Sequence, residues 1–189
     1  YWNRKIIKAN ELLKEAQKAI EEKNKELEKL AITDNLTDLY NRRKLDELLK
    51  NEIYRSDRFG HTFGFTILDI DHFKRVNDTY RHQTGDKVLI EIASILKNNL
   101  RKTDFVGRFG GEEFVIICPE SNIESVVKLM ENLRLIIQNH NFGKIKNQTV
   151  SFGVTLLKEA DTVDSILKRA DKALYKAKNS GRNKVSIII

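Results

Sequence analysis

The sequence predicts an α+β domain with a central antiparallel sheet and surrounding helices, preceded by one long helix. From residue 60 onward, strand-like apolar runs alternate with segments of helical periodicity, in the order strand, helices, hairpin, helix, strand, helix, strand. The kernel of that order is βαββαβ, the ferredoxin-like arrangement, and we expect helices to cover one face of its sheet. Residues 2–30 instead keep an unbroken helical pattern without glycine or proline.

Composition narrows the class of protein. The 189 residues are 40% hydrophobic and 32% charged, which suits one soluble domain with an extension. The net charge of +7 is spread along the chain, so it favours an anionic ligand such as a nucleotide over polymeric nucleic acid. The single cysteine, Cys118, excludes a disulfide framework, and neither a membrane-length apolar run nor a signal peptide is present.

The first 33 residues predict a parallel two-stranded coiled coil. Two series recur every seven positions: Ile6, Leu13, Ile20 and Leu27 in the first, and Trp2, Ala9, Ala16, Lys23 and Leu30 in the second. Apolar heptads favour a dimeric seam, although alanine and lysine in the second series weaken it. The alternative is a single amphipathic helix that packs on its own domain. Because the chain begins at Tyr1 inside this pattern, we expect a piece of a longer protein.

A cluster of Thr, Asp and Asn over residues 33–43 is typical of turns and helix caps, so it marks the boundary of a second domain, 34–189. A helix over 41–58 follows, and then a buried strand over 63–71 that ends in acids. Asp71 is a plausible N-cap for a short helix over 72–78. We expect a loop that includes Gly85-Asp86, and then a helix over 85–100.

The second half of this domain begins with a hairpin over 104–118. Its strands are followed by a helix over 122–139, with apolar residues at helical spacing. A strand over 149–156 precedes the last helix, 162–178, which Ser180-Gly181 ends. A terminal strand over 185–189 completes the chain.

The hairpin has unusual chemistry at its tip. Gly110 and Gly111 form the predicted turn because both can take positive φ at no steric cost, and Glu112 and Glu113 follow directly. A tip with solvated charges is the simplest interpretation. Glycines, however, would let a phosphate approach the backbone N–H groups, and neighbouring carboxylates are ligands for a hard divalent cation.

A third acid, Asp69, ends the buried strand, where an unpaired charge is costly. Alone it could be a helix cap. If its strand neighbours the hairpin, Asp69, Glu112 and Glu113 make a magnesium site, completed by backbone carbonyl and phosphate oxygens. Such a site lowers the pKa of a bound hydroxyl and neutralises charge on a phosphorus under in-line attack.

Other residues suggest nucleotide contacts, although each alone would be an ordinary surface or cap residue. Lys74, Arg108 and Lys184 could hold outer phosphates. Asn77 and Asp86 could read a purine, because a carboxylate accepts two hydrogen bonds from the N1–H and N2–H₂ edge of guanine, which adenine does not offer.

Six blocks in order resemble the GGDEF domain, the diguanylate cyclase family, over about residues 33–189. They lie at 34–43, 69–78, 85–86, 110–114, 170–178 and 181–183. The fourth block, Gly110-Gly111-Glu112-Glu113-Phe114, is the GGEEF form of the family's signature. Two positions depart from the family: Arg81 replaces a glycine, and Phe109 replaces the commoner tyrosine.

The resemblance implies an enzyme that condenses two GTP molecules into cyclic di-GMP and two pyrophosphates, with one GTP on each protomer of a facing homodimer. It implies two Mg²⁺ (or Mn²⁺) ions per active site, and either Glu112 or a metal-bound water as the base for the 3′-hydroxyl. The implied metal ligands are Asp69, the Ile70 carbonyl, Glu112 and Glu113. The implied substrate contacts are Asn77 and Asp86 for guanine, and Phe73, Lys74, Gly110, Gly111, Arg108 and Lys184 for ribose or phosphates.

The tetrapeptide Arg101-Lys102-Thr103-Asp104 fits the family's RxxD inhibitory site, five residues before the signature. By resemblance, cyclic di-GMP would bind Arg101 and Asp104 and inhibit its own synthesis. An arginine fork can engage guanine O6 and N7 or a phosphate.

Two other functions remain open. A catalytically silent domain could bind GTP or cyclic di-GMP as a receptor, although the intact acids argue against this. A basic ferredoxin-like RNA-binding module would place aromatic residues on exposed strands, whereas here acids lie at strand ends. We expect an upstream sensor domain and a cytoplasmic location, either free or as the cytoplasmic part of a membrane-bound bacterial sensor.

Overall fold

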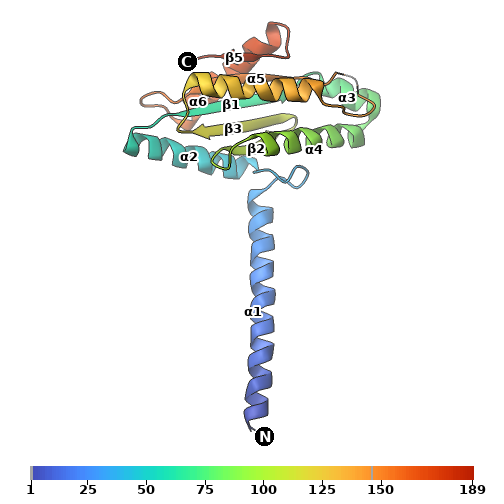
Figure 1. The fold of residues 1–189 in the computed structure, drawn as a ribbon, viewed down its shortest axis with the longest axis vertical. Coiled ribbons are helices and arrows are strands. Elements are labelled where there is room, and N and C mark those ends of the chain that lie inside the picture. Colours follow the sequence, from blue (N-terminus) through green and yellow to red (C-terminus); the bar gives the residue numbers. More distant parts are fainter. Residues whose placement is uncertain (1, 146) are drawn as a thin grey trace.

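A long helix, α1 (Trp2–Ile32), projects from a layered α/β head (Figure 1). The structure is a computed structural model that describes residues 2–145 and 147–189, without the side chains of residues 3–12, 25–26 and 28. The connecting segment, residues 33–41, joins α1 to the head. None of the described helices is both long and apolar enough to cross a membrane.

The sheet confirms the ferredoxin-like kernel. Its strands are β1 (Phe63–Ile70), β2 (Phe105–Gly110), β3 (Glu113–Pro119), β4 (Val150–Leu156) and β5 (Val185–Ile187), in the order β2-β3-β1-β4-β5. The first four strands are antiparallel, with β1 between β3 and β4. The short β5 runs parallel to β4, so the complete sheet is mixed rather than purely antiparallel.

Helices cover both faces of the sheet, so the expectation of one covered face was wrong. The helices of the head are α2 (Arg42–Phe59), α3 (Phe73–Tyr80), α4 (His82–Asn99), α5 (Ile123–Asn139) and α6 (Val163–Asn179). Helices α2 and α6 pack on the β1 row Phe63, Phe65 and Ile67, whereas α3, α4 and α5 pack on the row of Leu68 and Ile70. All eight residues of β1 are buried, because alternate side chains enter two separate cores.

Two local predictions were also wrong. Helix α4 begins at His82, so Gly85-Asp86 lies in its first turns and not in a loop. Asp71 does not cap α3: the cap position is His72, which makes no side-chain cap hydrogen bond. The buried Asp71 carboxylate instead accepts hydrogen bonds from the Thr149 hydroxyl at 2.7 Å and from two further groups of the chain.

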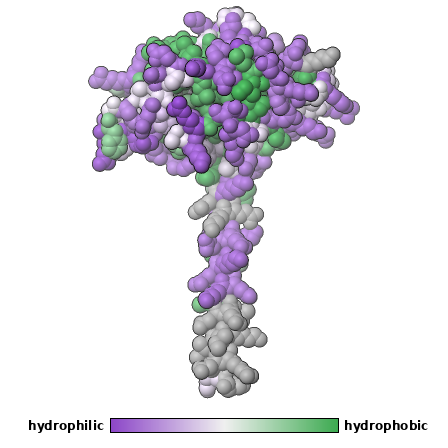
Figure 2. Space-filling model, viewed as in Figure 1, coloured by the Kyte–Doolittle hydropathy of each residue, from purple (hydrophilic) through white to green (hydrophobic). Residues whose placement is uncertain are grey.

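The apolar row of α1 faces solvent. Its described members are between 56% and 75% exposed: Trp2, Leu13, Ile20, Leu27 and Leu30. The side chain of Ile6 lies outside the described residues. The described part of the stem is otherwise largely hydrophilic, while hydrophobic residues gather on the head (Figure 2). The described members of this row therefore do not pack on the head, and the coiled coil remains a prediction.

Candidate active site

Two carboxylates face each other across neighbouring strands. Asp69 of β1 and Glu113 of β3 are register partners. Each continues an inward-facing row of its strand, because side chains two residues apart share one face of a sheet. Asp69 follows Ile67, and Glu113 precedes Val115, in the core beneath α2 and α6. The predicted adjacency of these two acids is therefore present.

The turn of the hairpin lies one residue later than predicted. Gly110 is the last residue of β2 and pairs with Glu113, after a register shift at Phe109. Gly111 and Glu112 form the turn, and Gly111 takes a left-handed φ of 51°. The Ile70 N–H donates to the Glu112 carbonyl at 3.4 Å, so the turn lies against the end of β1. A Cβ on either glycine would meet no atom within 4 Å, which leaves the backbone open to a ligand.

Lys178 of α6 completes this cluster, and sequence reasoning did not single it out. Its ammonium pairs with Asp69 Oδ2 at 2.8 Å. Burial raises the pKa of Asp69 to about 6; the hydrogen bond and charge of Lys178 oppose the shift, and the charges of Glu112 and Glu113 add to it. Burial likewise raises the pKa of Glu113, against the charge of Lys178. Helical spacing places Lys178 on the inward face of α6, four residues after the buried Leu174, but it does not indicate which strand residue the ammonium meets.

These acids suit a hard cation that also binds substrate. Among the described residues, no set of three carboxylate, imidazole or thiolate side chains is close enough to hold a metal by itself. Mg²⁺, however, usually uses one or two carboxylates together with substrate phosphates and water. Asp69 and Glu113 are half to fully buried oxygen donors on one face, with Glu112 in the adjoining turn. The donor set therefore fits Mg²⁺ or Mn²⁺ bound together with a nucleotide.

The proposed guanine contacts come together where α3 meets α4. A Cβ on Gly85 would lie 2.0 Å from Asn77 Oδ1 and 3.1 Å from the Phe73 ring, so only glycine permits this close approach. Asp86 is the next residue and is exposed. Phe73 is buried beneath this contact, whereas Lys74 beside it is exposed.

Two of the predicted phosphate contacts are engaged within the chain. The Arg108 guanidinium donates to the Gly111 carbonyl at 2.9 Å and pairs with Asp34 at 3.3 Å. The Lys184 ammonium donates to the Ser180 carbonyl, after the end of α6. Of these two cations, the structure brings Arg108 to the hairpin turn.

The predicted inhibitory residues lie at the opposite end of the hairpin from its turn. The Arg101 N–H donates to Asp104 Oδ2 at 2.9 Å. Burial raises the pKa of Asp104, and the hydrogen bond and charge of Arg101 oppose that shift. Arg101 also lines a surface pocket of about 370 Å³, together with Arg55 of α2 and Glu120.

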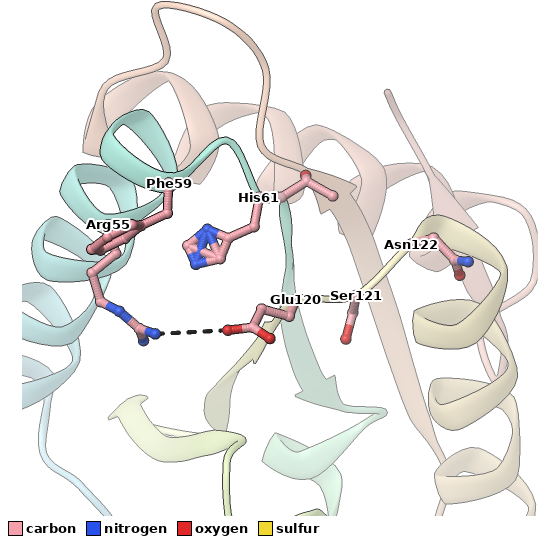
Figure 3. A pocket seen from close by; sticks show the side chains of 7 residues that line it. Arg55, Phe59, His61, Glu120, Ser121 and Asn122 are labelled. Atoms are coloured by element: carbon pink, nitrogen blue, oxygen red, sulfur yellow. Dashed lines mark ion pairs between the residues drawn. The ribbon is translucent and has the colours of Figure 1, made fainter.

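A second pocket, of about 580 Å³, adjoins the first through Arg55 and Glu120 (Figure 3). The Arg55 guanidinium and the Glu120 carboxylate pair at 3.8 Å, and the ring of His61 lies beside this pair. Both pockets are remote from Asp69, because they lie at the start of β1 and the end of β3.

Residues 31–184 match the family model described as the diguanylate cyclase GGDEF domain. The chain is 43% identical over 160 residues to the diguanylate cyclase DgcP of Pseudomonas aeruginosa, covering 83% of this chain and 24% of DgcP. It is 40% identical over 162 residues to the response regulator PleD of Caulobacter vibrioides, covering 82% of this chain and 36% of PleD. The chain thus spans about a quarter to a third of the length of these curated relatives.

Solved structures show the same fold. The crystal structure of the coiled coil and GGDEF domain of DgcB from Caulobacter crescentus, in complex with c-di-GMP, superposes with a TM-score of 0.84 at 33% sequence identity. The match covers 93% of this chain and 97% of that one, so it extends beyond the head.

Proposed function

The chain belongs to the diguanylate cyclase GGDEF family, and on that premise we propose that it joins two GTP molecules into cyclic di-GMP and two pyrophosphates. The observation that most supports this activity is the pair of buried Asp69 and half-buried Glu113, register partners beside an open glycine turn. Acids in this position suit phosphoryl transfer to a nucleotide hydroxyl, in which catalysis consists mainly of positioning and charge stabilisation.

The reaction is two successive displacements at phosphorus. The 3′-hydroxyl oxygen of one GTP forms a bond to the α-phosphorus of the other, and the bond from that phosphorus to pyrophosphate breaks. The proton of the hydroxyl passes to a base, for which Glu112 in the turn is the candidate. Mg²⁺ or Mn²⁺, held by Asp69, the Ile70 carbonyl, Glu112 and Glu113, would supply the positive charge that stabilises the transferring phosphoryl group.

Lys178 takes a second role in this scheme. Its ammonium is paired with Asp69 at 2.8 Å. If Asp69 held a cation, the Lys178 ammonium would pair with the triphosphate, which offers it an anionic partner beside Asp69. Lys178 therefore joins Lys74 as a residue that we assign to the phosphates.

Guanine would be held at the meeting point of α3 and α4. Asn77 and Asp86 supply an amide and a carboxylate, and the carboxylate accepts from the N1–H and N2–H₂ edge of the base. The same contact disfavours adenine, because adenine lacks this pair of donors and would leave the Asp86 carboxylate without its two hydrogen bonds.

The chemistry needs a homodimer, since each protomer would hold one GTP. The exposed apolar row of α1 provides a seam for a parallel coiled coil that brings two heads together. The DgcB structure, whose match covers 93% of this chain, contains a coiled coil together with its GGDEF domain, which supports this assignment. We assign α1 to signal input from an upstream sensor domain, in the cytoplasm.

We also assign Arg101 and Asp104 to product inhibition. They lie at the far end of the hairpin, so bound product would act at a distance from the turn. DgcB was crystallised with c-di-GMP, which supports a product-binding role in the family.

Incubation of the chain with GTP and Mg²⁺, followed by mass identification of the product, tests the proposed activity. We expect cyclic di-GMP from the wild-type chain, and a loss of orders of magnitude in Glu113→Ala and Glu112→Gln, with the far-UV spectrum unchanged. A folded Glu113→Ala protein with near-normal turnover would show that the metal site is wrong. Binding of GTP without turnover in the wild-type chain would instead favour a receptor.

A further inference from the structure

Arg108 joins the connecting segment to the catalytic turn. Its Nε donates to the Gly111 carbonyl at 2.9 Å, and its Nη1 lies 3.3 Å from both carboxylate oxygens of Asp34. The side chains are only 17% and 24% exposed, so solvent and salt screen this pair less than a surface ion pair. One guanidinium therefore holds a turn and a segment that are 74 residues apart in sequence.

Asp34 is itself held firmly. Its Oδ1 accepts from the Thr37 N–H at 3.0 Å and from the Thr37 hydroxyl at 2.8 Å, and its own N–H donates to the Leu39 carbonyl. Burial alone would raise the pKa of Asp34, yet the bonds from Thr37 and the charge of Arg108 hold it below its usual range. The carboxylate is thus a fixed, charged anchor for Arg108.

The same segment binds the end of α1. The Asn41 side-chain amide donates to the carbonyls of Ala31 at 3.0 Å and Thr33 at 3.2 Å, while its oxygen accepts from the Lys44 N–H at 3.0 Å. One side chain therefore caps the C-terminal end of α1 and the N-terminal end of α2. The backbone N–H of Arg108 also donates, at 2.8 Å, to the carbonyl of the residue before Asn41.

The turn has few other restraints. Gly111 is exposed, and a side chain there would touch nothing. Apart from the strand pairing, the contact of the turn with β1 is the 3.4 Å bond from Ile70 to the Glu112 carbonyl. Loss of the Arg108 bond would leave Glu112 at a loosely held hairpin tip.

We propose that Arg108 is a positioning residue, which fixes the Gly111–Glu112 turn against Asp34 and so transmits the placement of α1 to the catalytic carboxylates. This proposal rests on the cyclase activity proposed above. It differs from a direct phosphate contact, because the Nε and Nη1 donors of the guanidinium are already engaged by the chain. In this role Asp34 and Arg108 act as one unit.

A double-mutant cycle distinguishes the two roles. If Arg108 positions the turn, Arg108→Gln and Asp34→Asn each lower kcat about tenfold, the effect of losing one charge-assisted hydrogen bond, with KM for GTP within about twofold of wild type. The double variant is then no worse than either single variant, because both remove the same contact. If Arg108 binds phosphate, Arg108→Gln raises KM and Asp34→Asn is nearly silent, which would overturn the proposal.

Hydrogen exchange tests positioning without any turnover. Amides of residues 111–113 should exchange about tenfold faster in Arg108→Gln and Asp34→Asn than in the wild type. The reason is that the loss of one charged contact raises the population of the open turn by about that factor. Asp38→Asn is the matched control: Asp38 lies in the same segment, but its carboxylate pairs with Lys29 and Lys97 at the surface rather than with Arg108. Unchanged exchange in both test variants would refute the positioning role, whereas an inactive wild-type chain would count against the proposed function alone.

Discussion

Asp71 offers the sharpest stability prediction, because it is a buried charge with a complete set of partners. Asp71 as a whole is 3% exposed. Its Oδ1 accepts from the Ser151 hydroxyl at 2.7 Å, and its Oδ2 accepts from the Thr149 hydroxyl at 2.7 Å and the Asn183 N–H at 3.0 Å. It thereby ties the end of β1 to β4 and to the segment before β5, and Ser151 is the β4 register partner of Asp69.

Removing this carboxylate should cost a large part of the stability of the domain. Asp71→Ala deletes the acceptor for three donors; the hydroxyls can turn elsewhere, but the N–H cannot, so we expect a loss of about 4 kcal/mol. Asp71→Asn keeps the shape and one acceptor oxygen for the Thr149 hydroxyl and the Asn183 N–H, while the Ser151 hydroxyl can rotate to accept from the new NH₂ group; the charge assistance is lost, for about 2 kcal/mol. A domain that is stable by about 5–15 kcal/mol would still fold.

Urea unfolding followed by circular dichroism measures these losses. The unfolding midpoint of Asp71→Asn should lie below that of the wild type, and the midpoint of Asp71→Ala should be lower still, with the m value unchanged. Thr149→Val is the matched control, since it removes one donor and should cost about 1 kcal/mol. A free energy of unfolding for Asp71→Ala within about 1 kcal/mol of the wild-type value would refute this reasoning, since the hydrogen bonds of the carboxylate would then contribute little to stability.

Three further predictions concern function. Gly85→Ala would force a methyl group against the Asn77 amide, so KM for GTP should rise with kcat little changed, as steady-state kinetics would show. Replacing both Leu13 and Ile20 by Asp would bring like charges together at the seam of the coiled coil. The protein should then sediment as a monomer, and its specific activity should fall steeply at low protein concentration. Arg101→Ala should relieve inhibition by added cyclic di-GMP with little change in the initial rate.

Controls make these outcomes interpretable. Lys14 and Lys18 lie outside both heptad series of α1, so replacing both of them by Asp should leave the dimer intact. If the Leu13 and Ile20 double variant remains dimeric and fully active, the dimer forms elsewhere. Equal inhibition of the wild type and Arg101→Ala would remove Arg101 from the inhibitory site, and an unaltered KM in Gly85→Ala would argue against guanine binding at Asn77.

Much of the site was predictable because it depends on strand order. Asp69 and Glu113 were expected to meet if their strands were neighbours, and the βαββαβ kernel makes them so. Lys178 was missed because its distance from Asp69 depends on how α6 crosses the sheet, which local patterns do not specify.

The errors arose where tertiary contacts override local rules. Asp71 precedes a helix and resembles a cap, but the hydroxyl of Ser151 in β4 and the hydroxyl of Thr149, just before β4, donate to its carboxylate instead. Gly85 resembles a loop residue, yet it lies within α4 because close packing on Asn77 requires the absence of a side chain. The hairpin turn moved by one residue because of the shift at Phe109, which single-sequence turn rules do not register.

The central claim is that Asp69 and Glu113 act together in cyclic di-GMP synthesis. Its most direct test is the stoichiometry of the reaction, measured by quantifying GTP, pyrophosphate and nucleotide product for the wild-type chain and for folded Asp69→Asn. We predict two GTP consumed and two pyrophosphates released for each cyclic di-GMP, and a loss of orders of magnitude in Asp69→Asn. Release of GDP and phosphate by the wild type, or near-normal synthesis by Asp69→Asn, would contradict the claim.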